Sequence, residues 1–263
     1  MKPRRAGDIA AFTLVELAIV LVIIGLLVAG VLVGAEMIKN AEIRSFTSQL
    51  SRFNAATTAF RVKYANLPGD LSALRATKYA FTLRSGAAGH GDGNGILESC
   101  TASGRDLGCE TALFWLDLSQ AGLITNGISG ATDTYVDGTV AGFTLANYLP
   151  RGTVRRGLFY FAYSLNAENT YYLGGIASVN ASGVPALSAG LTPREAGDID
   201  EKLDDGNPSA GAIRAVSDLT TPDSGGTGVT GDCLVNTTTP VSYNRAGLFA
   251  DEVNCRLTLI NSI

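Results

Sequence analysis

Oxygen-bearing side chains follow residue 90 in the spacing of a calcium-binding loop. Asp92, Asn94 and Glu98 offer carboxylate and amide oxygens, which calcium prefers, and the glycines among them allow a tight backbone. The position at which a third ligand is expected holds the apolar residue Ile96. A glycine-rich turn is therefore the favoured interpretation of this segment, and a calcium site is the alternative.

Other chemistry-bearing residues argue against an enzyme. The single histidine, His90, excludes a multi-histidine metal site and has no obvious nucleophile beside it. The string from Gly226 to Gly231 matches a dinucleotide fingerprint, but no strand precedes it and no helix follows it, so we interpret it as a loop. The sequence contains no Walker string, no H-E-x-x-H and no G-x-S-x-G. We expect no catalytic activity, and no cofactor other than the calcium of that alternative.

An uncharged run of nineteen residues, Leu17 to Ala35, begins directly after the acidic residue Glu16. A helix rises about 1.5 Å per residue, so the run spans close to the ~30 Å hydrocarbon core of a bilayer. Lys2, Arg4 and Arg5 make the preceding flank positive. This charge predicts that the flank stays in the cytoplasm and that the rest of the chain is exported.

The acidic residue at the start of the run argues against two simple interpretations of the run. A cleaved secretory signal peptide and a plain signal anchor both have a positive flank and an apolar stretch, but neither accounts for Glu16. A carboxylate in a membrane helix costs roughly 2.5 to 3.5 kcal/mol at mid-depth and is rarely without a function. We therefore expect Glu16 to have a cationic partner.

Residues 11–17, Ala-Phe-Thr-Leu-Val-Glu-Leu, resemble the processing site of type IV pilins and type II secretion pseudopilins. The resemblance implies that a prepilin peptidase cuts before Phe12 on the cytoplasmic face and methylates the new amino terminus. Residues 1–11 would then be a prepilin leader. It also implies that Glu16 of one subunit neutralises the terminal amine of a neighbour, and that Phe12 and Glu16 thereby set the axial register of a filament.

The residue before the cut departs from the family pattern. Most members have glycine there, and this chain has Ala11. Alanine is also small, so cleavage between Ala11 and Phe12 is still the prediction, with slow processing or a low-abundance subunit left open. Cutting after Gly7 would place Asp8 first and move Glu16 out of position, so we reject that site.

The resemblance also implies a location and a set of partners. The chain would be a single-pass protein of the bacterial inner membrane, with a cytoplasmic amino terminus, and later part of a periplasmic or extracellular filament. Its partners would be other pilin subunits in a homo- or hetero-filament, the prepilin peptidase and the inner-membrane assembly platform. The formal charge of −4 gives no basic footprint, so nucleic acid is an unlikely partner.

The helical pattern continues beyond the apolar run. Apolar and aromatic residues recur at spacings of three and four from Ile43 to Tyr64, and there is no proline between Phe12 and Leu67. We predict one helix of roughly fifty residues, with a transmembrane or filament-core part at 12–35 and an amphipathic part at 36–66.

The predicted helix ends at 67–70, Leu-Pro-Gly-Asp, which suits a type II turn and also resembles a motif of one bacterial branch of pilin-like proteins. A coiled-coil dimer is the alternative use of the apolar stripe. The charged flanking positions typical of such coils are missing here. We therefore expect the stripe to pack against the chain's own exported domain.

The exported domain, residues 67–263, contains all four cysteines. None forms a C-x-x-C pair and export places them in an oxidising compartment, so disulfides are favoured over zinc. Four cysteines allow three connectivities. We favour Cys100 with Cys109 and Cys233 with Cys255, because both close local loops, each worth about 3 kcal/mol in the chain-entropy model. A loop closed by the second pair is similar to the variable D-region of pilins.

A second acidic cluster lies near the C-terminal part of this domain and consists of Asp198, Asp200, Asp204 and Asp205. Pseudopilins of the major class bind calcium in their C-terminal loops, so the resemblance implies a possible calcium site here. The alternative is a solvated helix face.

Local patterns predict the secondary structure of the exported domain. Residues 112–121 have the apolar face of a helix that buries Trp115, and residues 157–164 and 170–179 read as an antiparallel hairpin with a turn at 166–169. Thr192, Pro193 and Glu195 form a capping box for a short helix ending near residue 204. Residues 256–260 are expected to close the sheet.

Composition agrees with this organisation. The 263 residues are 46% apolar and 17% charged, against roughly 25% charged in ordinary domains, so disorder is excluded. The predicted fold class is α+β, a long N-terminal helix on a small antiparallel sheet with short helices, as in pilins. The predicted function is a structural filament subunit. The alternative is a minor or tip subunit whose enlarged exported domain binds a surface, DNA or a secreted ligand.

Overall fold

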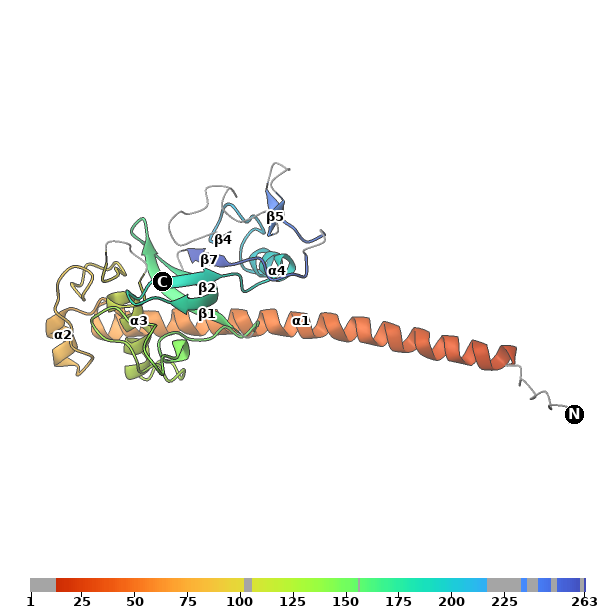
Figure 1. Cartoon of the computed structure of the whole chain (residues 1–263), viewed down its shortest axis with the longest axis horizontal. Coiled ribbons are helices and arrows are strands. Elements are labelled where there is room, and N and C mark those ends of the chain that lie inside the picture. Colours follow the sequence, from red (N-terminus) through yellow and green to blue (C-terminus); the bar gives the residue numbers. More distant parts are fainter. Residues whose placement is uncertain are drawn as a thin grey trace, which may run out of the picture. The chain divides into compact units, whose positions relative to one another are not determined.

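The computed structural model describes residues 13–101, 106–155, 157–216, 233–235, 241–246, 250–260 and 263. The element order confirms the α+β class, with one long N-terminal helix followed by short helices and an antiparallel sheet. The long helix, α1, covers Leu14–Tyr64 and has 51 residues, in agreement with the predicted length (Figure 1). The chain forms two compact units, Met1–Arg44 and Ser45–Ile263, so the second half of α1 belongs to the globular unit.

Within the globular unit, the aromatic stripe of α1 packs on the sheet and on a second helix. Phe53 contacts Trp115 and Tyr160 edge-on, with ring centroids 4.9 and 5.1 Å apart. Nearer the end of α1, Phe60 packs against Phe81, with centroids 5.5 Å apart. The Thr57 hydroxyl, at the step where the apolar pattern is interrupted, lies 3.4 Å from the buried Tyr171 hydroxyl. The stripe therefore packs against the chain's own domain, as the sequence predicts.

A turn with positive φ angles follows α1. Ala65 has a φ of 53° and Gly69 a φ of 83°, the value that a type II turn requires at its third position. A Cβ on Gly69 would lie 2.3 Å from the Glu110 carbonyl oxygen, so only glycine fits between the turn and the helix beside it. The Gly69 amide donates to Asp117, which forms a fully buried ion pair with Arg84.

A five-stranded antiparallel sheet forms the centre of the unit. The hairpin of β1 (Leu158–Leu165) and β2 (Glu168–Val179) is paired along its whole length. The other edge of β2 is shared by β7 (Leu257–Ile260) and β3 (Pro185–Ser188). Strand β4 (Ile213–Ala215) pairs with the far edge of β7. A separate ladder joins β5 (Leu234–Val235) to β6 (Ser242–Tyr243).

Two predictions about the sheet need correction. The hairpin turn consists of Asn166 and Ala167, whose φ angles of 52° and 65° suit a two-residue turn, so it is tighter than the predicted 166–169. Strand β7 lies between β2 and β4 rather than closing the edge. Strands β3 and β4 are too short for their alternation to be visible in the sequence.

Four short helical segments complete the unit: α2 (Ala73–Lys78), α3 (Cys109–Gln120), η1 (Leu145–Asn147) and α4 (Pro193–Leu203). Helix α3 begins three residues earlier than predicted, at a cysteine. Its Trp115 is fully buried, as expected, and stacks 5.5 Å from Tyr171 of β2. Helix α4 has the predicted capping box, in which the Thr192 hydroxyl accepts from the Glu195 amide.

Candidate functional site

The first turn of α1 positions Glu16. The Thr13 amide and hydroxyl donate to Oε2 of Glu16 at 2.8 and 2.9 Å, and the Thr13 hydroxyl accepts from the Glu16 amide at 3.2 Å. This is a capping box, which satisfies N–H groups that the helix itself leaves free. No interaction between the described residues involves the other carboxylate oxygen, Oε1. Ala11 and Phe12, the predicted processing site, lie outside the described residues.

The first half of α1 exposes a long apolar surface. Among the described residues, α1 is the one helix long and apolar enough to cross a membrane, by length and composition. Large side chains of its first half are exposed, including Leu21 at 69% and Leu27 at 63%. Apolar surface of this extent marks a contact with lipid or with another protein.

The structure joins Cys100 to Cys109 and Cys233 to Cys255, with Cα atoms 5.3 and 5.2 Å apart. This is the local pairing that the sequence favours, and it leaves no free cysteine. Both sulfurs of the second pair are fully buried. In the first pair, Cys109 is fully buried and begins α3, whereas Cys100 is partly exposed.

Two buried carboxylates that the sequence does not single out hold the glycine-rich loop. Asp70 accepts hydrogen bonds from the amides of Gly93 and Gly95, both at 2.6 Å. Glu110 accepts from the amides of Gly91 and Glu98 at 2.7 and 2.8 Å. Neither residue lies within the loop, so no local spacing could have identified them. The loop is thus fixed by its backbone donors, as the turn interpretation predicts.

Burial shifts the acidity of both carboxyls. Removal from water raises the pKa of Glu110 to about 8 and that of Asp70 to about 6, although the backbone hydrogen bonds act in the opposite direction. The negative charge of Asp92 raises both values further. Near neutral pH the Glu110 carboxyl is therefore largely protonated.

The predicted calcium ligands of this loop do not form one open oxygen set. Asp92 lies close to Asp70 and Glu110, with ligand atoms within 4.8 Å of one another. The Asn94 amide nitrogen, rather than its oxygen, faces the carboxylates of Asp92 and Glu98, and its oxygen accepts from the Ile96 amide. Backbone amides donate to the oxygens of Asp70 and Glu110, and calcium binding at this group stays a prediction.

In the C-terminal acidic cluster, three carboxylates likewise lie together and one lies apart. Asp200, Asp204 and Asp205 gather with ligand atoms within 4.8 Å, while Asp198 pairs with Arg245 at 2.5 Å. Asp200 accepts from the Tyr243 hydroxyl at 2.8 Å and from the Gly206 amide. Asp204 accepts from the amides of Ala212 and Ile213, at the start of β4. These carboxylates hold a loop through hydrogen bonds, and calcium binding at this cluster stays a prediction.

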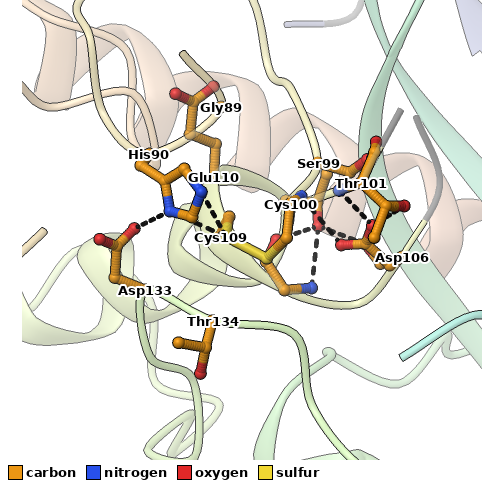
Figure 2. Close-up of a disulfide and its surroundings, with 12 residues drawn as sticks. Gly89, His90, Ser99, Cys100, Thr101, Asp106, Cys109, Glu110, Asp133 and Thr134 are labelled. Atoms are coloured by element: carbon orange, nitrogen blue, oxygen red, sulfur yellow. Dashed lines mark hydrogen bonds and ion pairs between the residues drawn. A yellow bond between two sulfur atoms is a disulfide. The ribbon is translucent and has the colours of Figure 1, made fainter. Parts of the chain in front are cut away.

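Figure 2 shows a contact that the sequence does not predict. The His90 imidazole lies with Nδ1 3.0 Å from Oδ1 of Asp133 and 3.2 Å from Sγ of Cys109 (Figure 2). The other carboxylate oxygen of Asp133 accepts from the Ser85 amide at 2.7 Å. The three groups come from separate segments, two loops and the start of α3, so no spacing in the sequence links them. His90 therefore faces a disulfide and a carboxylate.

The chain is thus an α+β protein with a membrane-spanning candidate helix and a globular unit that carries two disulfides. Comparison with protein-family models, with curated proteins and with solved structures finds no match at a significant level. The dinucleotide-like string at 226–231 lies outside the described residues.

Proposed function

We propose that this chain is a structural subunit of a type IV pilus-like or type II secretion pseudopilus filament. In this proposal a prepilin peptidase cuts between Ala11 and Phe12, and the subunit leaves the inner membrane to assemble through α1. The globular unit then lies on the outside of the filament, in the periplasm or beyond it.

The observation that carries the proposal is the first turn of α1. Glu16 is held there by Thr13 through one carboxylate oxygen and is followed by nineteen uncharged residues. A carboxylate on such a helix is costly in hydrocarbon unless a cation neutralises it. The terminal amine created by cleavage before Phe12 is a cation of the required kind on a neighbouring subunit.

Electrostatics explains why this pair would set the register. Two opposite charges attract far more strongly inside an apolar helix bundle than in water, and the attraction falls with distance. A subunit displaced along the filament axis would leave a carboxylate and an amine unpaired in that bundle. The apolar surface of α1 supplies the packing, and the ion pair selects one axial position.

The test compares three chains in cells that carry a prepilin peptidase and a filament assembly platform. The wild-type chain should yield a product whose mass and N-terminal sequence begin at methylated Phe12. Glu16→Val should be inserted and cut normally but absent from sheared filaments, with a reduction of at least about tenfold. Glu36→Gln, on the same helix beyond the uncharged run, is the matched control and should assemble.

Each result has a clear meaning. An uncut wild-type chain would contradict the filament assignment and indicate a permanently anchored protein with an exported domain. Normal filaments from Glu16→Val would contradict the register mechanism alone.

A second candidate is a minor or tip subunit that binds a surface, DNA or a secreted ligand. It is favoured by the elaboration between α1 and β1, where α2, α3 and one disulfide are inserted before the sheet begins. Abundance separates the two candidates, because a major subunit dominates sheared filaments and a tip subunit is present in traces.

A further inference from the structure

The two sulfurs of the Cys100–Cys109 disulfide lie in unequal surroundings. Cys109 is fully buried at the start of α3. Cys100 is partly exposed and lines a surface cavity of about 480 Å³, together with Gly89, Ser99 and Thr101. Figure 2 draws the pair with Cys109 turned toward His90 and Cys100 on the side of Ser99 and Thr101. Cys100 is thus the member of the pair that borders the cavity.

The groups around the two cysteines favour negative charge on Cys109. His90 Nδ1 lies 3.2 Å from the Cys109 sulfur and 3.0 Å from the Asp133 carboxylate. The helix dipole of α3 also places positive potential at Cys109. On the other side, the Asp106 carboxylate accepts from the Cys100 amide at 3.1 Å and so adds negative charge near Cys100.

The backbone of Cys109 adds a further asymmetry. Its φ angle is 48°, a left-handed conformation that residues with a side chain rarely adopt. The N-cap residue Gly108 packs against the disulfide so closely that a Cβ there would lie 2.8 Å from the Cys100 sulfur.

We propose that Cys100–Cys109 is an exchange-active disulfide that a low-molecular-weight thiol opens from the cavity. The thiolate sulfur attacks Sγ of Cys100 and forms a new S–S bond with it. The Cys100–Cys109 bond breaks, and its electron pair leaves on Sγ of Cys109 as a thiolate. The product is a mixed disulfide on Cys100, and no net oxidation or reduction occurs.

His90 has a positioning role in this step. Its Nδ1 lies within hydrogen-bond distance of both the Asp133 carboxylate and the Cys109 sulfur, so the tautomer that carries the proton on Nδ1 can donate to the thiolate as that charge forms. In the second disulfide, by contrast, both cysteines, Cys233 and Cys255, are fully buried. It serves as an internal control within the same chain.

The test treats the full oxidised chain in detergent with reduced glutathione, blocks free thiols with N-ethylmaleimide at intervals, and maps both labels by peptide mass spectrometry. We expect glutathione on Cys100, maleimide on Cys109 and an intact Cys233–Cys255 bond. Glutathione on Cys109, or both disulfides opening at one rate, would overturn the proposal. These results need no variant, so they hold even where a substitution prevents folding.

Variants test the role of His90 in the same assay. His90→Leu should slow exchange about tenfold, because a hydrogen bond to a charged sulfur is lost. His90→Asn, whose amide also offers N–H donors, should recover part of the rate. Asp137→Asn, a change at a partly exposed residue a few positions from Asp133, is the control and should match wild type. An unchanged rate in a folded His90→Leu protein would remove His90 from the mechanism.

Discussion

The two halves of α1 have the same backbone and opposite surroundings. In the first half Leu21 and Leu27 are 69% and 63% exposed, while in the second half Phe46 and Phe60 are fully buried in the globular unit. The second half finds its partner surface within the chain. The first half has no such surface among the described residues, and the proposed function assigns lipid or other subunits to it.

The two capping boxes sharpen this contrast. Thr13 with Glu16, and Thr192 with Glu195, make the same reciprocal hydrogen bonds at 2.8 and 3.2 Å. Glu195 also forms an ion pair with Arg155 at 2.9 Å, inside its own domain. Glu16 has no cation among the described residues. The same local motif is therefore complete at α4 and lacks a counter-charge at α1.

Raised pH should weaken the globular unit and leave the first half of α1 unaffected. Burial raises the pKa of Glu110 to about 8 and of Asp70 to about 6, so the folded state holds protons that the unfolded chain releases. The contribution of these two protonated carboxyls to the free energy of unfolding is then fully present below about pH 4 and falls as pH rises toward 8. The slope for one such carboxyl approaches 1.4 kcal/mol per pH unit, on the order expected from linkage.

Urea unfolding of the full chain in detergent across this pH range measures the effect. Glu110→Gln keeps an oxygen that accepts the backbone hydrogen bonds but cannot ionise, so it should flatten the slope above pH 6. Glu201→Gln, an exposed change on α4, is the control and should retain the wild-type slope. An unaltered slope in Glu110→Gln would show that Glu110 does not control the pH dependence.

Truncating one large apolar side chain in each region should give very different results. Trp115→Ala removes a fully buried ring between Phe53 and Tyr171, and should lower the free energy of unfolding by about 4 kcal/mol. Leu27→Ala removes contacts with detergent alone and should change it by less than about 0.5 kcal/mol. Urea midpoints at one detergent concentration compare the two. A large effect of Leu27→Ala would mean that the first half of α1 also packs within the chain.

Elements with strong local signals are visible in the sequence. The length of α1, the aromatic stripe, the β1–β2 hairpin and the α4 capping box follow from periodicity and from cap chemistry, which act between neighbouring residues. The start of α3 at Cys109 and the interior place of β7 depend on tertiary pairing instead. No local pattern encodes either of them.

The candidate sites show the same limit. Glu16 is recognisable because a lone acid beside nineteen uncharged residues is unusual in itself. Asp70 and Glu110 are not recognisable as the residues that hold the glycine-rich loop. They lie on either side of that loop and reach it only when the chain has folded. The His90, Asp133 and Cys109 contact joins three separate segments for the same reason.

The smallest expected effect separates the two capping boxes. Thr192→Ala removes the side-chain acceptor at the start of α4 and should lower the free energy of unfolding of the globular unit by about 1 kcal/mol. Thr13→Ala removes the same acceptor from α1, outside that unit, and should leave the urea midpoint unchanged. If both lowered it equally, the start of α1 would be coupled to the folding of the globular unit. A change confined to Thr192→Ala would mean that the capping box at α1 does not contribute to the stability of the globular unit.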